Sequence, residues 1–154
     1  MITIDDILHD LRPGAEYGRR GEPVNEAEYD SMIIWRDPVT VKPTYADLVT
    51  QKPITRLRVA KEKKVAELQI EMANRQNVNM GTNLPIEYLN DMLNWLDTLW
   101  RSVDAGSRNP RIAWTNAINI QQAFIDARNV INNFAVLNDV NNYDVVNDPP
   151  WPVV

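Results

Sequence analysis

The stretch PIEYLNDMLNWLDTLWRSV, residues 85–103, carries a long apolar stripe. Pro85 suits the first position of a helix, because its missing N–H would have no partner there. Apolar side chains then recur at spacings of three and four, which places them on one helix face: Ile86, Leu89, Leu93, Leu96, Trp100 and Val103. Such a face must be buried against another element. The stretch therefore predicts a helix over residues 85–104.

A second stripe with the same spacing lies near the end of the chain. Its members are Ile120, Phe124, Ala127, Ile131 and Phe134. Asn119 is the expected N-cap, with Gln122 three residues later. Two matched stripes joined by a short connection are typical of an antiparallel helical pair. We therefore expect helices at 85–104 and 119–138 to pack together, with residues 111–115 (RIAWT) as a short extended piece.

A third helix is predicted over residues 55–76, which are rich in helix formers and contain no Gly or Pro. Its apolar stripe is interrupted by Lys61, and the run KEKK at 61–64 adds further charge. This composition indicates a solvated rod that packs as a third helix on the pair or projects from it. The run itself is either a partner contact or an exposed helix face, and the exposed face is favoured.

The first 53 residues predict a small α+β head. Thr3 and Asp6 have the spacing of a capping box for a short helix that Pro13 and Gly14 end. The inner face of that helix is expected to consist of Ile4, Ile7, Leu8 and Leu11. Residues 15–25 read as a loop or irregular strand, and residues 31–35 (SMIIW) as a strand. A second capping box, Thr44 with Asp47, predicts another short helix that stops at Pro53.

These elements give a mainly α fold with three parts. The expected boundaries are 1–53 for the α+β head, 54–138 for the helical body and 139–154 for an extended tail. The tail contains Asn, Pro and β-forming residues, and its Trp151 and valines are expected to dock on another surface.

Composition excludes several classes of function. The chain has 154 residues and a net charge of −5, which argues against a nucleic-acid or anionic-membrane surface. It has no cysteine, so disulfides and thiol chemistry are ruled out. No apolar run approaches the roughly 18 residues of a membrane span. The acidic start lacks the features of a signal peptide, so we expect synthesis and folding in a cytoplasm.

Candidate catalytic and metal-binding residues are few. His9 is the only histidine, and no Ser or Cys arrangement accompanies it. Asp5, Asp6 and Asp10 could in principle hold Mg²⁺ or Ca²⁺, but Asp5 and Asp6 also suit the first turn of a helix. Phosphate-binding, hydrolase and zinc motifs are absent from the sequence. The sequence therefore predicts no enzyme, no cofactor and no metal site.

The five tryptophans are the candidate interaction residues. Trp35 is expected in the core of the head, while Trp95 and Trp100 flank the central stripe and are more typical of a core than of an interface. Trp114 and Trp151 lie in or beside irregular segments, where aromatic side chains often anchor a partner. The interaction candidates are Trp95, Trp100, Trp114 and Trp151.

The order of several short motifs resembles a known group of proteins. These motifs are ILHDLRPGAEY at 7–17, IIWRD at 33–37, KPTYADLVTQ at 42–51, AWT at 113–115 and PPWP at 149–152. In this order they resemble small proteins of tailed bacteriophages and prophages whose genes lie beside the tail-fibre genes. The segment NVNMGTNLP at 77–85 and the aromatic stretch after it depart from that pattern.

The resemblance implies a non-catalytic structural protein of the virion tail. Its expected role is a fibre-proximal adaptor that links or braces tail fibres at the baseplate, as a homo-oligomer or bound to a fibre trimer, with neither nucleic acid nor membrane as a partner. The alternative is a tail-fibre assembly chaperone absent from the mature virion. A third possibility, an enzyme or small-molecule binder with a site between helices, finds no convergent polar residues in the sequence.

Overall fold

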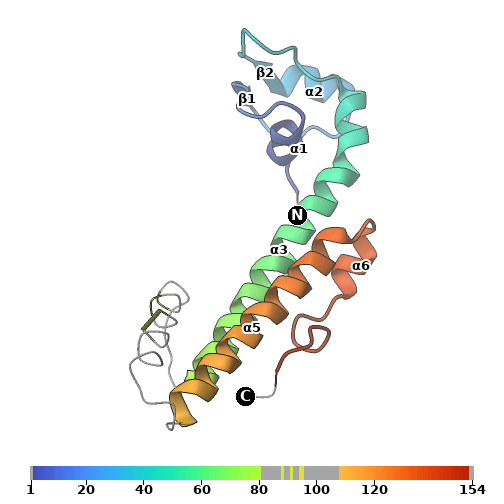
Figure 1. Cartoon of the computed structure of the whole chain (residues 1–154). Coiled ribbons are helices and arrows are strands. Elements are labelled where there is room, and N and C mark those ends of the chain that lie inside the picture. Colours follow the sequence, from blue (N-terminus) through green and yellow to red (C-terminus); the bar gives the residue numbers. More distant parts are fainter. Residues whose placement is uncertain (1, 81–87, 89–90, 92–93, 96–107, 153–154) are drawn as a thin grey trace. The chain divides into compact units, whose positions relative to one another are not determined.

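A computed structural model describes residues 2–80, 88, 91, 94–95 and 108–152 (Figure 1). The chain is 66% helical and 5% strand, which confirms the predicted mainly α fold with a small α+β head. It divides into two compact units, Met1–Ala60 (unit 1) and Lys61–Val154 (unit 2). Most of the predicted helix at 85–104 lies outside the described residues, where only Tyr88, Asp91, Asn94 and Trp95 are helical.

Helix α1 (Ile4–Leu11) begins at the predicted capping box. The backbone N–H of Asp6 donates to Thr3 Oγ1 at 3.3 Å, and the N–H of Thr3 donates to Asp6 Oδ2 at 2.7 Å. Together these bonds satisfy two backbone donors that the first turn leaves free. The helix buries Ile4, Ile7 and Leu8, as predicted. It ends before Gly14, whose φ of 79° is a left-handed conformation that favours glycine.

The sheet of unit 1 consists of two short antiparallel strands, β1 (Tyr17–Arg19) and β2 (Ile33–Trp35). Tyr17 lies opposite Trp35, and their rings stack with centroids 5.9 Å apart. The predicted strand at 31–35 was two residues too long, because Ser31 and Met32 belong to α2 (Glu26–Met32). That helix is capped by Asn25, whose side chain accepts from the N–H of Glu28 at 2.9 Å.

A single apolar cluster holds unit 1 together. Its buried members come from α1, α2, β2 and α3: Ile4, Ile7, Leu8, Tyr29, Ile33 and Leu48. Tyr29 keeps its hydroxyl satisfied by donating to the carbonyl of Pro43 at 2.8 Å. The ring therefore contributes apolar burial without leaving a polar group unpaired.

Helix α3 (Tyr45–Met80) begins at the second predicted capping box, formed by Thr44 and Asp47. The prediction that Pro53 ends this helix is wrong, because α3 continues through it. Proline fixes φ near the helical value, so its cost in a helix is a lost N–H and a clash with the carbonyl four residues earlier. Strong helix formers follow Pro53, and the buried Thr55 donates a hydrogen bond to Asp10. Together they outweigh that cost.

In unit 2, α3 and α5 (Arg108–Asn133) lie side by side and antiparallel (Figure 1). Lys61 Nζ donates to the carbonyl of Asn132 at 2.7 Å, and Gln76 Nε2 donates to the carbonyl of Ala117 at 2.9 Å. The described antiparallel partner of α5 is therefore α3, and the predicted pairing of 119–138 with 85–104 involves residues outside the described ones. Of the two arrangements expected for this helix, projecting or packing on another helix, α3 packs over this length, and Leu68 is fully buried against α5.

The bounds of α5 differ from the prediction. Residues 111–115, expected to be extended, lie within α5, and Asn119 is an interior residue of the helix rather than its cap. Pro110 lies in the first turn, where proline is tolerated. The predicted stripe is confirmed: Ile120, Ala127 and Ile131 are buried, and Phe124 and Phe134 are partly buried.

The C-terminal segment folds back onto unit 2. The predicted helix at 119–138 is divided in two, because α5 ends at Asn133 and the short helix α6 (Leu137–Asn142) follows. The predicted tail, residues 139–154, starts inside α6. Tyr143, Val145 and Trp151 then pack against the cluster of Leu68, Ala127 and Ile131. The tail therefore docks on its own unit.

Candidate interaction site

The four predicted tryptophans occupy different environments. Trp95 is 59% exposed, in contrast with the core position that the sequence favoured. Trp100 lies outside the described residues. Trp114 lies in α5, but its side chain is not among those described.

Trp151 is the tryptophan whose surroundings are best defined. Its indole Nε1 donates to the carbonyl of Val145 at 3.0 Å, and its backbone N–H donates to that of Pro149 at 2.7 Å. The guanidinium carbon of Arg75 lies 4.9 Å from the ring centroid, at the distance of a cation–π contact. This side chain is therefore engaged within its own unit.

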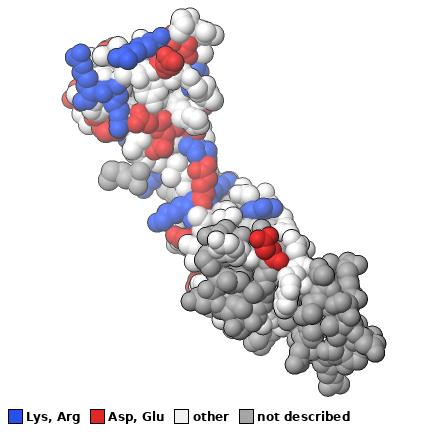
Figure 2. Space-filling model, turned by 90° about the vertical axis from the view of Figure 1, so that its left-hand side faces the viewer, with Lys and Arg blue, Asp and Glu red and all other residues white. Residues whose placement is uncertain are grey.

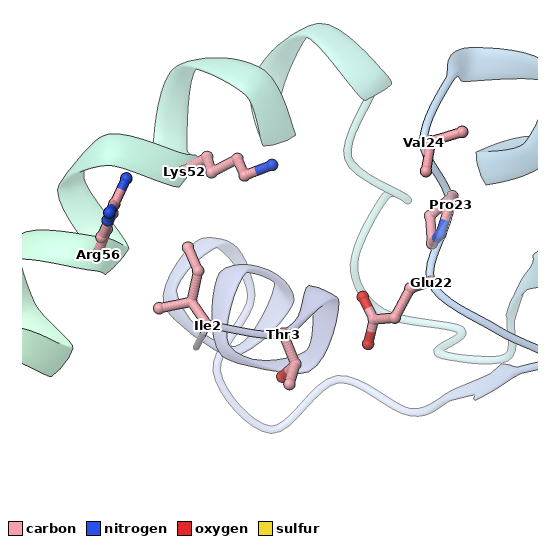
Figure 3. A pocket seen from close by; sticks show the side chains of 7 residues that line it. All are labelled: Ile2, Thr3, Glu22, Pro23, Val24, Lys52 and Arg56. Carbon is pink, nitrogen blue, oxygen red and sulfur yellow. The ribbon is translucent and has the colours of Figure 1, made fainter.

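Unit 1 has a groove among the described residues. It has a volume of about 600 Å³ and is lined by residues from the N-terminal segment, the connection before α2 and the start of α3: Ile2, Thr3, Glu22, Pro23, Val24, Lys52 and Arg56 (Figure 3). That volume falls within the roughly 300–1,000 Å³ typical of small-ligand sites. The groove can therefore hold a few side chains of a partner.

Two cations form one wall of the groove. Lys52 and Arg56 are both exposed and lie one helical turn apart on α3. In Figure 3 the Lys52 side chain extends from α3 toward the segment that contains Glu22, Pro23 and Val24. Ile2 lies between these two walls and contributes an apolar side chain to the groove.

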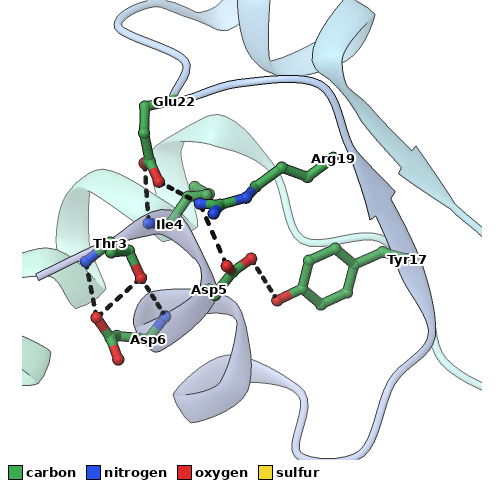
Figure 4. Close-up of polar contacts among 7 residues, drawn as sticks. All are labelled: Thr3, Ile4, Asp5, Asp6, Tyr17, Arg19 and Glu22. Atoms are coloured by element: carbon green, nitrogen blue, oxygen red, sulfur yellow. Dashed lines mark hydrogen bonds and ion pairs between the residues drawn. The ribbon is translucent and has the colours of Figure 1, made fainter.

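The opposite wall carries one acid, and both of its oxygens are engaged (Figure 4). Glu22 Oε2 accepts from the backbone N–H of Ile4 at 3.0 Å, and Oε1 pairs with the Arg19 guanidinium. Arg19 also pairs with Asp5 at 3.2 Å. Glu22 is therefore held in place by the backbone of α1 and by Arg19, which it shares with Asp5.

The polar network beside the groove fixes the protonation of its members. Asp5 Oδ1 accepts from the Tyr17 hydroxyl at 3.0 Å. Burial, and then the bond to Asp5, raises the pKa of Tyr17 to about 12. Hydrogen bonds from the backbone and side chain of Thr3 lower the pKa of Asp6 below its usual 3.8. Near neutral pH, Tyr17 is therefore protonated and Asp6 is ionised.

The three acidic residues considered as metal ligands have separate partners. Asp5 bonds to Tyr17 and Arg19, and Asp6 belongs to the capping box. Asp10 accepts from Thr55 Oγ1 at 2.6 Å and pairs with Arg58 at 2.9 Å. His9 is exposed. Within the described ranges, no three acidic or histidine side chains group together where they could hold a metal ion.

Charge on the visible face of unit 1 is mixed in sign. Figure 2 shows Lys and Arg side chains interspersed with Asp and Glu side chains on this face. Mixed charge of this kind differs from the continuous basic stripe of a nucleic-acid interface. Among the helices that the structure describes, none has an apolar window long enough to cross a membrane.

Sequence reasoning based on aromatic residues did not find the groove. Its walls are contributed by residues 2–3, 22–24 and 52–56, which only the folded chain brings together. One signal was available: no carboxylate stands three or four residues from Lys52 or Arg56.

Comparisons of the chain with known protein families, with curated proteins and with solved structures found no match.

Proposed function

We propose that the chain is a non-catalytic structural protein of a bacteriophage tail, a fibre-proximal adaptor that links or braces tail fibres at the baseplate. It would be made in the host bacterial cytoplasm and incorporated into the virion tail. Tail-fibre or baseplate proteins would be its partners, with the chain acting as a homo-oligomer or bound to a fibre trimer.

Three of the five motifs that carry the sequence resemblance coincide with residues that build unit 1, while AWT at 113–115 and PPWP at 149–152 lie in unit 2. Pro13 and Gly14 follow α1, the sequence IIWRD contains β2, and Thr44 with Asp47 caps α3. These residues set turns, caps and strand pairing. The resemblance therefore concerns residues that shape the fold, not residues that could take part in a reaction. This supports a structural role over an enzymatic one.

The observation that carries the proposal is the loop between β2 and α3. It presents two valines to solvent, Val39 at 87% and Val41 at 79% exposure. Exposed apolar side chains close together on a surface are typical of protein–protein contacts.

The loop is also held in a defined shape. Asp37 Oδ1 accepts from the N–H of Val39 at 2.8 Å, and Trp35 Nε1 donates to the carbonyl of Thr40 at 2.7 Å. The hydrogen bonds from Val39 and Thr40 hold the pKa of Asp37 below 3.8, so the side chain stays ionised near neutral pH. A loop fixed in this way loses little conformational entropy when a partner binds.

Binding to the fibre trimer of the same phage tests the proposal. The full chain is mixed with the purified trimer, and complex formation is followed by size-exclusion chromatography and titration. We expect a stable complex that V39A/V41A weakens by about tenfold or more, since that corresponds to roughly 1.4 kcal/mol. The matched control is V49A/I54A, which removes two exposed apolar side chains from α3 and should leave binding unchanged.

The same experiment separates the adaptor from the alternative. A chaperone would bind newly made fibre chains and leave once the trimer is complete. Binding to unfolded or nascent fibre, combined with none to the finished trimer, would overturn the adaptor and favour the chaperone.

A further inference from the structure

The two cations of the groove have no acidic partner among the residues that the structure describes. The residues three or four positions from Lys52 and Arg56 along α3 include no Asp or Glu, and neither cation forms an ion pair with any described residue. Further along α3, Lys64 pairs with Glu67 at 3.0 Å and Arg75 with Glu71 at 2.8 Å. Two like charges one turn apart destabilise a helix slightly, so this pair is not explained by helix stability.

The groove also has an apolar side. Ile2, Pro23 and Val24 line it opposite or beside the cations, and Val24 is 75% exposed. A ligand that fits both parts must combine a negative charge with aliphatic surface. A small inorganic anion would leave the apolar side uncovered.

The acid in the groove does not cancel the cations. Glu22 is held by the Ile4 N–H and by Arg19, and Arg19 in turn pairs with Asp5. The carboxylate of Glu22 is thus directed to groups outside the basic wall. Lys52 and Arg56 are therefore the charges of the groove that have no ion pair among the described residues, on a chain whose net charge is −5. That net charge disfavours polyanions such as nucleic acid, whereas a short segment with one or two carboxylates meets mainly the two nearby cations, because more distant charges are screened by salt.

We propose that this groove binds an extended segment of a partner protein in which acidic and aliphatic residues alternate. A carboxylate of the segment pairs with Lys52 and Arg56, and a neighbouring aliphatic side chain lies on Ile2, Pro23 and Val24. In an extended segment successive side chains point to opposite sides, so acids on one side and aliphatics on the other match the two parts of the groove. The inference rests on the proposed function only in taking the partner to be another protein.

A synthetic peptide provides the probe. The full chain, labelled with ¹⁵N, is titrated with acetyl-SVELEVS-amide and followed by two-dimensional NMR. We expect shifts centred on the backbone amides of residues 2–3, 22–24 and 52–56. The control peptide acetyl-SVQLQVS-amide, which keeps the shape and loses the charge, should bind about tenfold more weakly or worse.

Matched variants locate the binding. K52Q/R56Q should lower the affinity of the chain for the acidic peptide by about tenfold or more. R20Q/K63Q makes the same change in net charge at two exposed residues outside the groove and should leave the affinity unchanged. Four results would overturn the proposal: no binding, equal binding of both peptides, equal loss in both variants, or the same shifts produced by inorganic phosphate alone.

Failure of this inference is distinguishable from failure of the proposed function. Peptide binding in the groove, with the chain unable to bind the fibre trimer, overturns the adaptor and leaves the groove assignment standing. A chain that binds the trimer but not the acidic peptide overturns the groove assignment alone.

Discussion

At the scale of single residues, four aspartates accept backbone hydrogen bonds that fix helix starts and turns among the described residues. Asp6 and Asp47 close capping boxes with Thr3 and Thr44, while Asp37 and Asp144 accept backbone N–H groups in turns. In each case hydrogen bonds to the ionised carboxylate lower its pKa below 3.8. Each aspartate therefore stabilises the folded chain only while it is ionised.

These pKa shifts predict acid sensitivity. A carboxyl group whose pKa is lower in the folded chain contributes stability above the unfolded value of 3.8, and loses it as pH falls through the folded pKa. The free energy of unfolding should therefore be smaller at about pH 2 than at about pH 5. Urea denaturation at the two pH values measures the difference.

The double variant D6N/D47N should reduce this acid-induced loss, because asparagine can still accept hydrogen bonds but does not titrate. D91N, at an exposed helical aspartate, is the control and should leave the loss unchanged. An equal loss in D6N/D47N and in the unaltered chain would contradict the role given to these carboxylates.

Capping residues were also the part of the fold that sequence predicted best at this scale. Thr3 with Asp6 and Thr44 with Asp47 act over three residues, so their spacing alone identifies them. Asn25 of α2 was missed, since the strand signal of residues 31–35 overlapped the end of that short helix.

At the scale of elements, Gln76 is a buried polar side chain between α3 and α5 whose hydrogen bonding is incomplete among the described residues. Gln76 is 1% exposed and donates to the carbonyl of Ala117 at 2.9 Å. Its Oε1 has no partner among the described residues. An unpaired buried acceptor costs about 1–3 kcal/mol, whereas one hydrogen bond contributes about 0.5–1.5 kcal/mol.

Replacing Gln76 by methionine should therefore stabilise the chain. Methionine is similar in length, removes the unpaired oxygen and loses only one hydrogen bond. We expect Q76M to raise the free energy of unfolding by about 1 kcal/mol in urea denaturation. Q69M, at an exposed position of the same helix, should change it by less than about 0.5 kcal/mol. A loss of stability in Q76M would show that Oε1 is satisfied.

Helix partners and helix ends were harder to predict than helix faces. A stripe such as Ile120, Ala127 and Ile131 identifies the face that is buried but not the element that covers it. The lysines of α3 suggested that this helix faces solvent. Lys64 and Glu67 instead pair with each other, and Leu68 packs on α5. Pro53 predicted a helix end because proline is unfavourable inside a helix. The helix continues because the packing around Pro53 outweighs this local preference.

At the scale of the whole molecule, the C-terminal segment completes unit 2. Trp151, Tyr143 and Val145 cover the same buried cluster that joins α3 and α5. Arg75 contributes from α3, donating to the carbonyl of Val146 at 3.2 Å. Docking of the tail was expected from its Trp and valines, but the surface it docks on depends on how the helices pair.

Removal of Trp151 should therefore destabilise the chain. We expect W151A to lower the free energy of unfolding by about 1–3 kcal/mol, less than for a fully buried aromatic side chain because Trp151 is partly exposed. W95A removes a tryptophan that is 59% exposed and should cost less than 1 kcal/mol. Equal costs for the two variants would contradict docking of the tail.

The candidate site belongs to this scale as well. The sequence singled out aromatic residues, because buried aromatics dominate many interfaces. The groove instead combines cations of α3 with residues 2–3 and 22–24, which lie far apart in the sequence. Such a site depends on tertiary contacts, so its residue types are visible in the sequence but their meeting point is not.

The proposed function makes this chain part of a phage particle, and mass spectrometry of purified infectious particles tests that claim most directly. The measurement is the molar ratio of this chain to the tail-fibre protein. The adaptor account predicts that the chain is present at a fixed ratio after extensive purification. Absence from particles, while the chain is abundant in the lysate of infected cells, would contradict it.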